Sequence, residues 1–176
     1  QKEDFREEEL NRKMHKAIAI IQFKLEGELI KRRPDFQMED RLLLDKVDYE
    51  KGTIRIDGKE YPLKDRHFPT IDPKDPYRLT KEEEYVVEHL KTAFKYCAYL
   101  NEHVRFLFSK GGLYKVYNDM LLYHGCVPLN EDGSFREVEI QGSLYSGKEL
   151  YDVLERLARQ GYYEEKDAQI RAYGQD

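Results

Sequence analysis

Apolar side chains recur every three or four positions from about residue 4 to residue 33. This spacing predicts a long amphipathic helix, because it places the apolar residues on one helix face. The members of this apolar stripe are Leu10, Met14, Ile18, Ile21, Leu25 and Leu29. Pro34 follows the pattern and is expected to end the helix.

Short segments after Pro34 predict a small antiparallel meander. The expected strands cover residues 42–48, 53–57 and 59–63. Asp57-Gly58, between the last two strands, is a preferred two-residue hairpin turn. Ile54 and Ile56 would lie on one face of this ribbon, which therefore needs a helix to cover its apolar side.

Residues 64–79 combine prolines with polar residues and are expected to form an extended surface loop. Thr80 and Glu83 have the spacing of a capping box, which predicts that a second long helix begins there. Its apolar positions are Val86 or Val87, Leu90, Phe94, Cys97, Leu100, Val104 and Leu107. The glycines at 111 and 112 are expected to end this helix in the left-handed conformation.

A hairpin follows, with strands at residues 113–117 and 120–123 and a tight turn at Asn118-Asp119. The second strand is almost continuously apolar, so we expect it to be buried on both faces. It would deliver the sequence His124-Gly125 at its end.

The last part of the chain predicts one more strand and one more helix. Residues 135–140 alternate as a strand after a turn at 130–133. Ser146 and Glu149 have capping-box spacing for a helix that is expected to end at Gly161. The whole pattern predicts an α+β fold, which we divide into a helix-plus-meander region at residues 1–79 and a second region at 80–176.

Charge and composition narrow the functional classes. Charged residues make up 37% of the chain and the net charge is −5, which argues against a nucleic-acid or anionic-membrane partner. The longest apolar runs are far shorter than the roughly 20 residues of a membrane helix. Cys97 and Cys126 are far apart, in an expected helix and at a buried strand end, so a reduced, cytoplasmic setting fits. The first residue is Gln1, with no initiator Met, and we expect the chain to be an internal piece of a longer one.

His124 is the best candidate for chemistry. It stands at the end of an expected strand, before a glycine that lets the backbone turn sharply, and neutral imidazole is a favoured ligand of divalent transition metals. The alternative is structural: the imidazole could hydrogen-bond a backbone carbonyl at the edge of the core. The residues alone leave both interpretations open, and no catalytic or substrate-binding residue is assigned.

Other polar clusters favour structural roles. His15, His67, His89 and His103 have no i, i+4 spacing for a shared metal and are expected to be structural or exposed. The glutamate runs at 7–9 and 82–84 and the basic run at 31–33 suit exposed helix ends, where they complement the helix dipole. Lys110-Gly111-Gly112 follows a helix instead of preceding one, so it is not a phosphate-binding loop.

Several long blocks of the sequence resemble class III fructose-1,6-bisphosphatases. The resemblance runs collinearly from about residue 18 to the end of the chain. It is carried by residues 20–27, 41–46, 49–52, 61–65, 68–73, 103–107, 109–111 and 122–135, the last reading Leu122-Tyr123-His124-Gly125-Cys126-Val127-Pro128 and onward through Phe135.

That family is similar to the calcineurin-like metallophosphatases, so the resemblance implies that the hairpin and the strand belong to an incomplete α/β sandwich holding two divalent metals. It implies His124 as one ligand, Mn²⁺ as the metal, and fructose 1,6-bisphosphate as the substrate, hydrolysed to fructose 6-phosphate in gluconeogenesis. The family's other metal motifs, an Asp-x-His, a Gly-Asp-x-x-Asp-Arg, a Gly-Asn-His and a later Gly-His, are expected to lie outside this chain. We therefore expect the chain alone to be inactive.

A non-enzymatic role is the alternative hypothesis. The long helices and the meander could form an oligomerisation or regulatory module, with residues 1–110 as an accessory insertion and 113–161 as part of the catalytic sheet. Apolar strands that lack their partners would also favour homo-oligomers.

Overall fold

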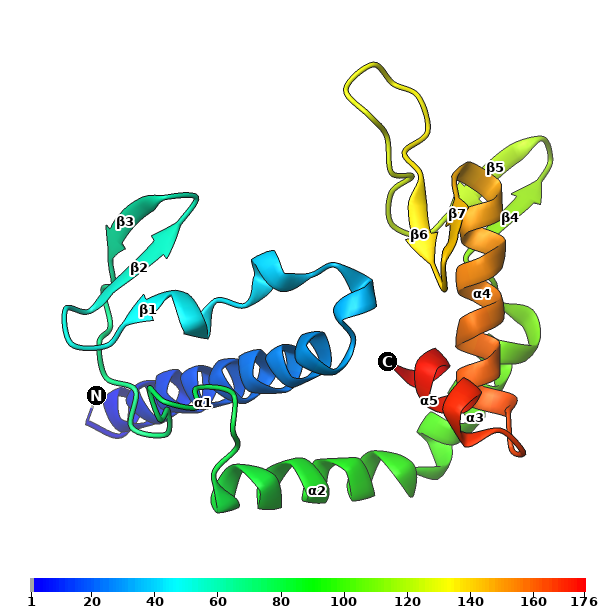
Figure 1. The fold of residues 1–176 in the computed structure, drawn as a ribbon. Helices are drawn as coiled ribbons and strands as arrows, with labels where there is room; N and C mark the ends of the chain where they lie inside the picture. Colours follow the sequence, from blue (N-terminus) through cyan, green and yellow to red (C-terminus); the bar gives the residue numbers. More distant parts are fainter. Residues whose placement is uncertain (1) are drawn as a thin grey trace. The chain divides into compact units, whose positions relative to one another are not determined.

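The computed structural model describes residues 2–176, with side chains from residue 6 onward. The chain forms two compact units, Gln1–Lys91 and Thr92–Asp176. Helices and small antiparallel sheets alternate along it, which confirms the predicted α+β class (Figure 1). The expected division at residues 79 and 80 stays a prediction about domains.

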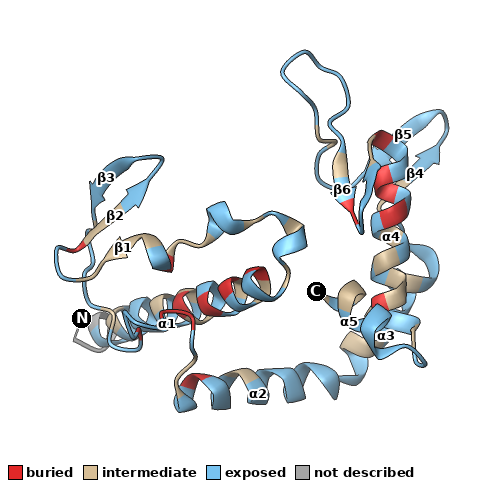
Figure 2. Ribbon diagram, viewed as in Figure 1, coloured by how far each residue is buried: buried red, intermediate tan, exposed pale blue. Residues whose placement is uncertain are grey.

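The first helix, α1, spans Lys2–Arg32, as predicted. Its buried positions are Ile20, Lys24, Gly27 and Ile30 (Figure 2). The apolar stripe from residue 10 to residue 29 lies on a different face, where Leu10, Met14 and Ile18 are each more than half exposed. The spacing of apolar residues therefore located the helix correctly but does not mark the face that packs. The packed face carries Gly27, which has no side chain, and Lys24, whose amine is paired, so other segments can approach the helix closely there.

The first strand of the meander is predicted too long. Three 3-10 helices follow α1: η1 at Pro34–Phe36, η2 at Glu39–Arg41 and η3 at Leu44–Lys46. The last of them occupies most of the expected strand, and β1 covers only Val47–Asp48. The reason lies in Tyr77, whose hydroxyl oxygen accepts hydrogen bonds from the backbone N–H groups of Leu44 (3.1 Å) and Asp45 (3.3 Å). These donors are therefore satisfied by a side chain instead of a strand ladder.

The other strands of the meander are confirmed. β2 spans Thr53–Ile56, β3 spans Lys59–Pro62, and the sheet has the order β1-β2-β3. Asp57 and Gly58 both have positive φ, 49° and 77°, as a type I′ hairpin turn requires. The apolar side of the ribbon is not fully covered, since Ile56 is 37% exposed.

The core of residues 1–91 gathers Ile20, Leu44, Ile71 and Tyr77. Ile71 and Tyr77 come from residues 64–79, which form a loop without regular helix or strand, as predicted. The segment was predicted to be a surface loop, but these two side chains are part of the core. A Cβ at Gly27 would lie 2.0 Å from the Tyr77 ring, so the ring needs the glycine to pack against α1.

The second helix, α2, spans Lys81–Lys95 and starts with the predicted capping box. The carboxylate of Glu83 accepts from Thr80 N at 2.8 Å, and Glu83 N donates to the Thr80 hydroxyl at 3.3 Å. The same carboxylate binds Lys24 at 2.7 Å, and both side chains are buried. Glu83 therefore departs from the prediction that its glutamate run is exposed.

Thr80→Ala is expected to lower the free energy of unfolding of residues 1–91 by about 1 kcal/mol, because it removes one half of the capping box. Amide hydrogen exchange in the first turn of α2 would measure the loss. Thr92→Ala, at an exposed position of the same helix, is the matched control and should change little. Equal exchange rates in both variants would contradict a capping role for Thr80.

The single long helix predicted up to residue 110 is wrong. α2 ends at Lys95 and α3 spans Ala98–Lys110, with Cys97 in extended backbone conformation between them. The side-chain amide of Asn101 donates to the carbonyl of Lys95 at 2.9 Å, which satisfies an acceptor that the break leaves open. The predicted left-handed conformation at the end of the helix is also wrong, since Gly111 has a φ of −82°.

The predicted hairpin is present, with β4 at Tyr114–Tyr117 and β5 at Met120–Tyr123. Asn118 and Asp119 have φ values of 49° and 58°, again a type I′ turn. The expected burial of the second strand is wrong, since every residue of β5 is at least half exposed. Within residues 2–176 this sheet has only two strands, so no neighbouring strand covers β5.

The remaining elements are β6 (Val138–Ile140), β7 (Ser143–Tyr145), α4 (Gly147–Tyr163) and α5 (Ala168–Gln175). The predicted strand from residue 135 is shorter than expected, and β7 was not predicted. Ile140, Leu150 and Val153 form the core of this unit. No described helix combines the length and the apolar character needed to cross a membrane.

Two expectations for α4 are wrong. Ser146 makes no side-chain capping bond, so the predicted capping box is absent. Gly161 does not end the helix but lies buried inside it, because the backbone of α5 comes very close at this point: a Cβ on Gly161 would lie 2.5 Å from Gly174 C and O. Here the glycine serves helix packing.

Candidate functional site

His124 directly follows β5, as predicted, and its side chain is exposed. Its backbone N–H donates to Leu113 O at 2.8 Å, which extends the hairpin pairing by one residue. Gly125 then takes a φ of 75°, so the chain turns away from the strand at once. On the strand side the backbone of His124 is thus held by a hydrogen bond, and on the other side it bends at once into a turn.

A second contact reaches the same residue from α4. The hydroxyl of Tyr151 donates to His124 O at 3.3 Å. Tyr151 is 8% exposed, and its ring meets those of Tyr114 and Tyr123 edge to face, with centroid distances of 6.1 and 6.4 Å. Burial raises the pKa of Tyr151 above its usual value of 10, so the hydroxyl remains a donor at neutral pH.

The described residues do not build a complete metal site around His124. No group of three or more His, Cys, Asp or Glu side chains in this part of the chain could hold a metal ion. Cys126 is exposed and not at a buried strand end as expected. The exposed imidazole suits the role of one ligand, and a complete metal site would need ligands from outside residues 2–176.

The other histidines are exposed, as predicted. Asp65-Arg66-His67, however, has the Asp-x-His spacing that was expected only outside the chain. Its carboxylate binds Lys16 Nζ at 2.7 Å and accepts from His67 N at 2.9 Å, which is the pattern of a turn with an ion pair. The motif therefore has a structural role in a loop of the first unit.

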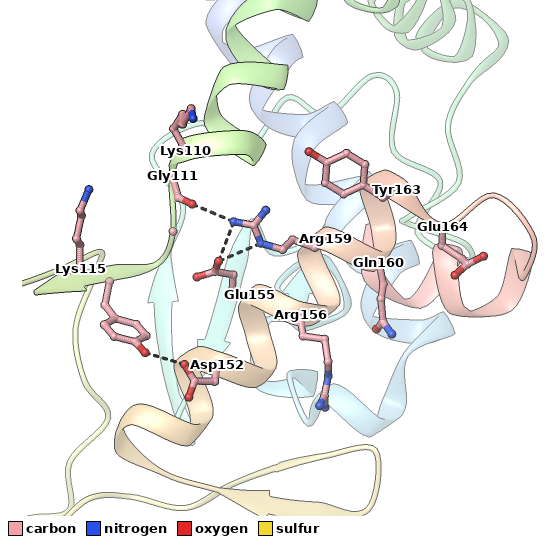
Figure 3. A pocket seen from close by; sticks show the side chains of 12 residues that line it. Lys110, Gly111, Lys115, Asp152, Glu155, Arg156, Arg159, Gln160, Tyr163 and Glu164 are labelled. Atoms are coloured by element: carbon pink, nitrogen blue, oxygen red, sulfur yellow. Dashed lines mark hydrogen bonds and ion pairs between the residues drawn. The ribbon is translucent and has the colours of Figure 1, made fainter.

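A cleft of about 920 Å³ lies between the end of α3 and α4 (Figure 3). Within α4, at the edge of this cleft, the Arg159 guanidinium forms two bonds to Glu155 Oε1, at 2.8 and 3.0 Å. It also donates to the carbonyls of Phe108 and Gly111. Leu113 N donates to the second oxygen of Glu155 at 3.2 Å. Glu155 and Arg159 thus bind the backbone at the carboxyl end of α3 to α4, which is a structural role.

The sequence interpretation missed this pair, although the i, i+4 spacing of Glu155 and Arg159 was a usable signal. Lys110, Lys115 and Arg156 also line the cleft and have no ion-pair partner among the described residues. Figure 3 shows Lys110 and Lys115 on one side and Arg156 on the other, pointing away from each other. These cations do not converge on one anion position, so the cleft supports no phosphate site.

Comparison with known proteins gives consistent matches. The family model described as Firmicute fructose-1,6-bisphosphatase matches residues 1–176. Proteins named fructose-1,6-bisphosphatase class 3 are 54% identical in Clostridium novyi (strain NT), over 93% of this chain, and 55% identical in Clostridioides difficile (strain 630), over 97%. The relative of the same name in Clostridium acetobutylicum (strain ATCC 824) is 56% identical over 97% of the chain.

This chain covers only part of each relative: 25% of the C. novyi protein and 26% of the other two. No solved structure matches it. The family match nevertheless extends over the full length of the chain, through the hairpin, His124 and α4 alike. The chain therefore belongs to the Firmicute fructose-1,6-bisphosphatase family.

Proposed function

We propose that this chain is part of a longer, cytoplasmic enzyme that hydrolyses fructose 1,6-bisphosphate to fructose 6-phosphate and phosphate. In this proposal His124 supplies one ligand of a divalent metal site, with Mn²⁺ as the metal. Bound metals of this kind lower the pKa of a coordinated water and hold phosphoryl oxygens. The remaining ligands come from parts of the enzyme outside residues 1–176.

The observation that carries the proposal is the position of His124 in a chain with this family membership. The imidazole is exposed at the end of a strand, and its backbone is held from two sides, by Leu113 and by Tyr151. A ligand residue needs this combination, because the metal must reach the side chain while the backbone keeps its direction.

His124→Ala in the full-length enzyme is expected to lower kcat/KM for fructose 1,6-bisphosphate by at least about 100-fold, because one metal ligand is lost. A Mn²⁺ titration of the same variant should show weakened binding. His103→Ala, at an exposed position of α3, is the matched control and should keep both values. The proposal would be wrong if metal affinity and turnover in His124→Ala equalled those of the unmodified enzyme.

A regulatory or oligomerisation module remains a second candidate, favoured by one observation. Leu10, Met14 and Ile18 form a row of exposed apolar side chains along α1, and such a row is typical of a surface that packs against another segment. This role is compatible with the first, since the same chain could carry both the row and His124.

A further inference from the structure

The direction of a ligand side chain depends on its backbone, and for His124 that backbone is held on two sides. On the strand side, His124 N is bound to Leu113 O. On the other side, the chain turns at Gly125, which has a positive φ. Glycine adopts this conformation at no steric cost, so the turn by itself does not restrain the backbone. The contact that restrains the turning side is the one from Tyr151 to His124 O.

The Tyr151 ring is a rigid support for this contact. It projects from α4, whose neighbouring residues Leu150 and Val153 belong to the core. Tyr151 is buried, and its edge-to-face contacts with Tyr114 and Tyr123, which pair across the hairpin, hold the ring against β4 and β5. A tyrosine has few rotatable bonds, so its hydroxyl is held at a defined distance from the helix.

The hydroxyl has a function that the ring does not explain. A phenylalanine would keep the ring contacts with Tyr114 and Tyr123 and the place of the ring in the apolar lining that it shares with Val127 and Phe135. The tyrosine adds only an O–H group, and the partner of that group is the carbonyl of the candidate metal ligand. This bond is partly buried, and losing the hydroxyl would leave the His124 carbonyl without its partner from α4.

We propose that Tyr151 is a positioning residue for metal binding: its hydroxyl holds the His124 carbonyl and so keeps the imidazole pointing toward the metal. This inference rests on the proposed function, because it assumes that His124 is a ligand. Groups that orient a metal ligand typically change metal affinity by about 10- to 100-fold when removed. Tyr151 acts through the backbone and not on the imidazole itself, so the expected effect lies at the lower end of this range.

The test is Tyr151→Phe in the full-length enzyme, which removes the hydroxyl and keeps the ring. Mn²⁺ affinity, measured by the electron paramagnetic resonance of free Mn²⁺, is expected to fall about 10-fold. Amide hydrogen exchange at His124, whose N–H is bound to Leu113 O, should accelerate, a readout that needs no metal. Tyr114→Phe is the matched control: its hydroxyl binds Asp152 at 2.9 Å, so its loss should leave Mn²⁺ affinity unchanged.

A double-mutant cycle separates positioning from general stability. In a His124→Ala background, Tyr151→Phe is expected to have no further effect on Mn²⁺ affinity, because its action passes through His124. Unchanged affinity in Tyr151→Phe, with lowered affinity in His124→Ala, would overturn this inference and leave the proposed function intact. Unchanged affinity in His124→Ala itself would overturn both. Additive losses in the cycle would show that Tyr151 does not act through His124.

Discussion

Glu83→Gln is expected to lower the free energy of unfolding of residues 1–91 by about 3 kcal/mol, because it leaves a buried lysine without its counter-charge. Lys24 is fully buried and binds Glu83 Oε2 at 2.7 Å and Thr70 O at 2.5 Å. With the carboxylate gone, only neutral oxygens face the ammonium group. Amide hydrogen exchange in α1 would measure the loss.

At acidic pH the free energies of unfolding of Glu83→Gln and of the unmodified protein should differ less than at neutral pH. Burial alone would raise the pKa of Glu83, but the hydrogen bonds from Lys24 and from Thr80 N outweigh it and lower the pKa below the usual 4.5. A carboxylate with a lowered pKa contributes stability above its unfolded pKa and loses it as the pH falls through the folded one. The stability gap between wild type and Glu83→Gln is therefore expected to shrink below pH 4.5.

Two further variants test whether the loss of stability comes from the buried ion pair. Glu84→Gln changes the neighbouring exposed glutamate of the same helix and should cost less than about 1 kcal/mol. Lys24→Met combined with Glu83→Gln removes both charges and should be less destabilising than the two single changes added together. A small effect of Glu83→Gln, equal to that of Glu84→Gln, would refute the importance of the buried pair.

Gly161→Ala is expected to lower the free energy of unfolding of residues 92–176 by about 2 to 3 kcal/mol. Alanine favours a helix over glycine by about 1 kcal/mol, so an isolated α4 would gain stability. In the folded unit the added methyl would overlap the backbone of Gly174 at 2.5 Å, and neither backbone can give way easily. Urea denaturation followed by circular dichroism would measure the change.

The reciprocal glycine provides the control for this effect. A Cβ on Gly174 would lie 2.3 Å from Leu157 O and 2.5 Å from Gly161 N, so Gly174→Ala should be destabilising to a similar degree. Ala158→Gly, at an exposed position of α4, should cost only the helix propensity of about 1 kcal/mol. A more stable Gly161→Ala protein would contradict the close packing of α4 and α5.

Local sequence signals predicted local structure well. Both type I′ turns, at Asp57-Gly58 and Asn118-Asp119, were recognisable because few residue pairs tolerate positive φ at two successive positions. The Thr80 and Glu83 capping box was equally clear, since it depends on residues three positions apart. At Ser146 the same spacing was misleading, because Gly147 begins the helix with a φ of 50° and no capping bond forms.

Burial was predicted poorly, and for one reason. An apolar residue can be packed only where another segment reaches it, and that segment is not encoded in the local pattern. β5 is apolar on both faces but has only β4 beside it in the described sheet. Leu10, Met14 and Ile18 of the apolar stripe of α1 are also more than half exposed, while Lys24 on another face is fully buried.

In the candidate site, too, one residue could be predicted from the sequence and one could not. His124 could be singled out from the sequence, because a strand, a histidine and a glycine follow one another and the family resemblance includes them. Tyr151 could not, because it lies 27 residues further along and nothing in its neighbourhood indicates a contact with the hairpin. Only the packing of α4 against β4 and β5 brings the two residues together.

The sequence by itself determined the family, the extent of α1, the turns, and the place of His124 at a strand end. The tertiary structure decided which helix faces are buried, where the second long helix breaks, and which side chains hold His124 and Lys24. The physical reason is the range of the interactions. Turns and caps form among residues a few positions apart, whereas Lys24 meets Glu83 across 59 positions of the chain, and such a contact exists only when the whole unit is folded.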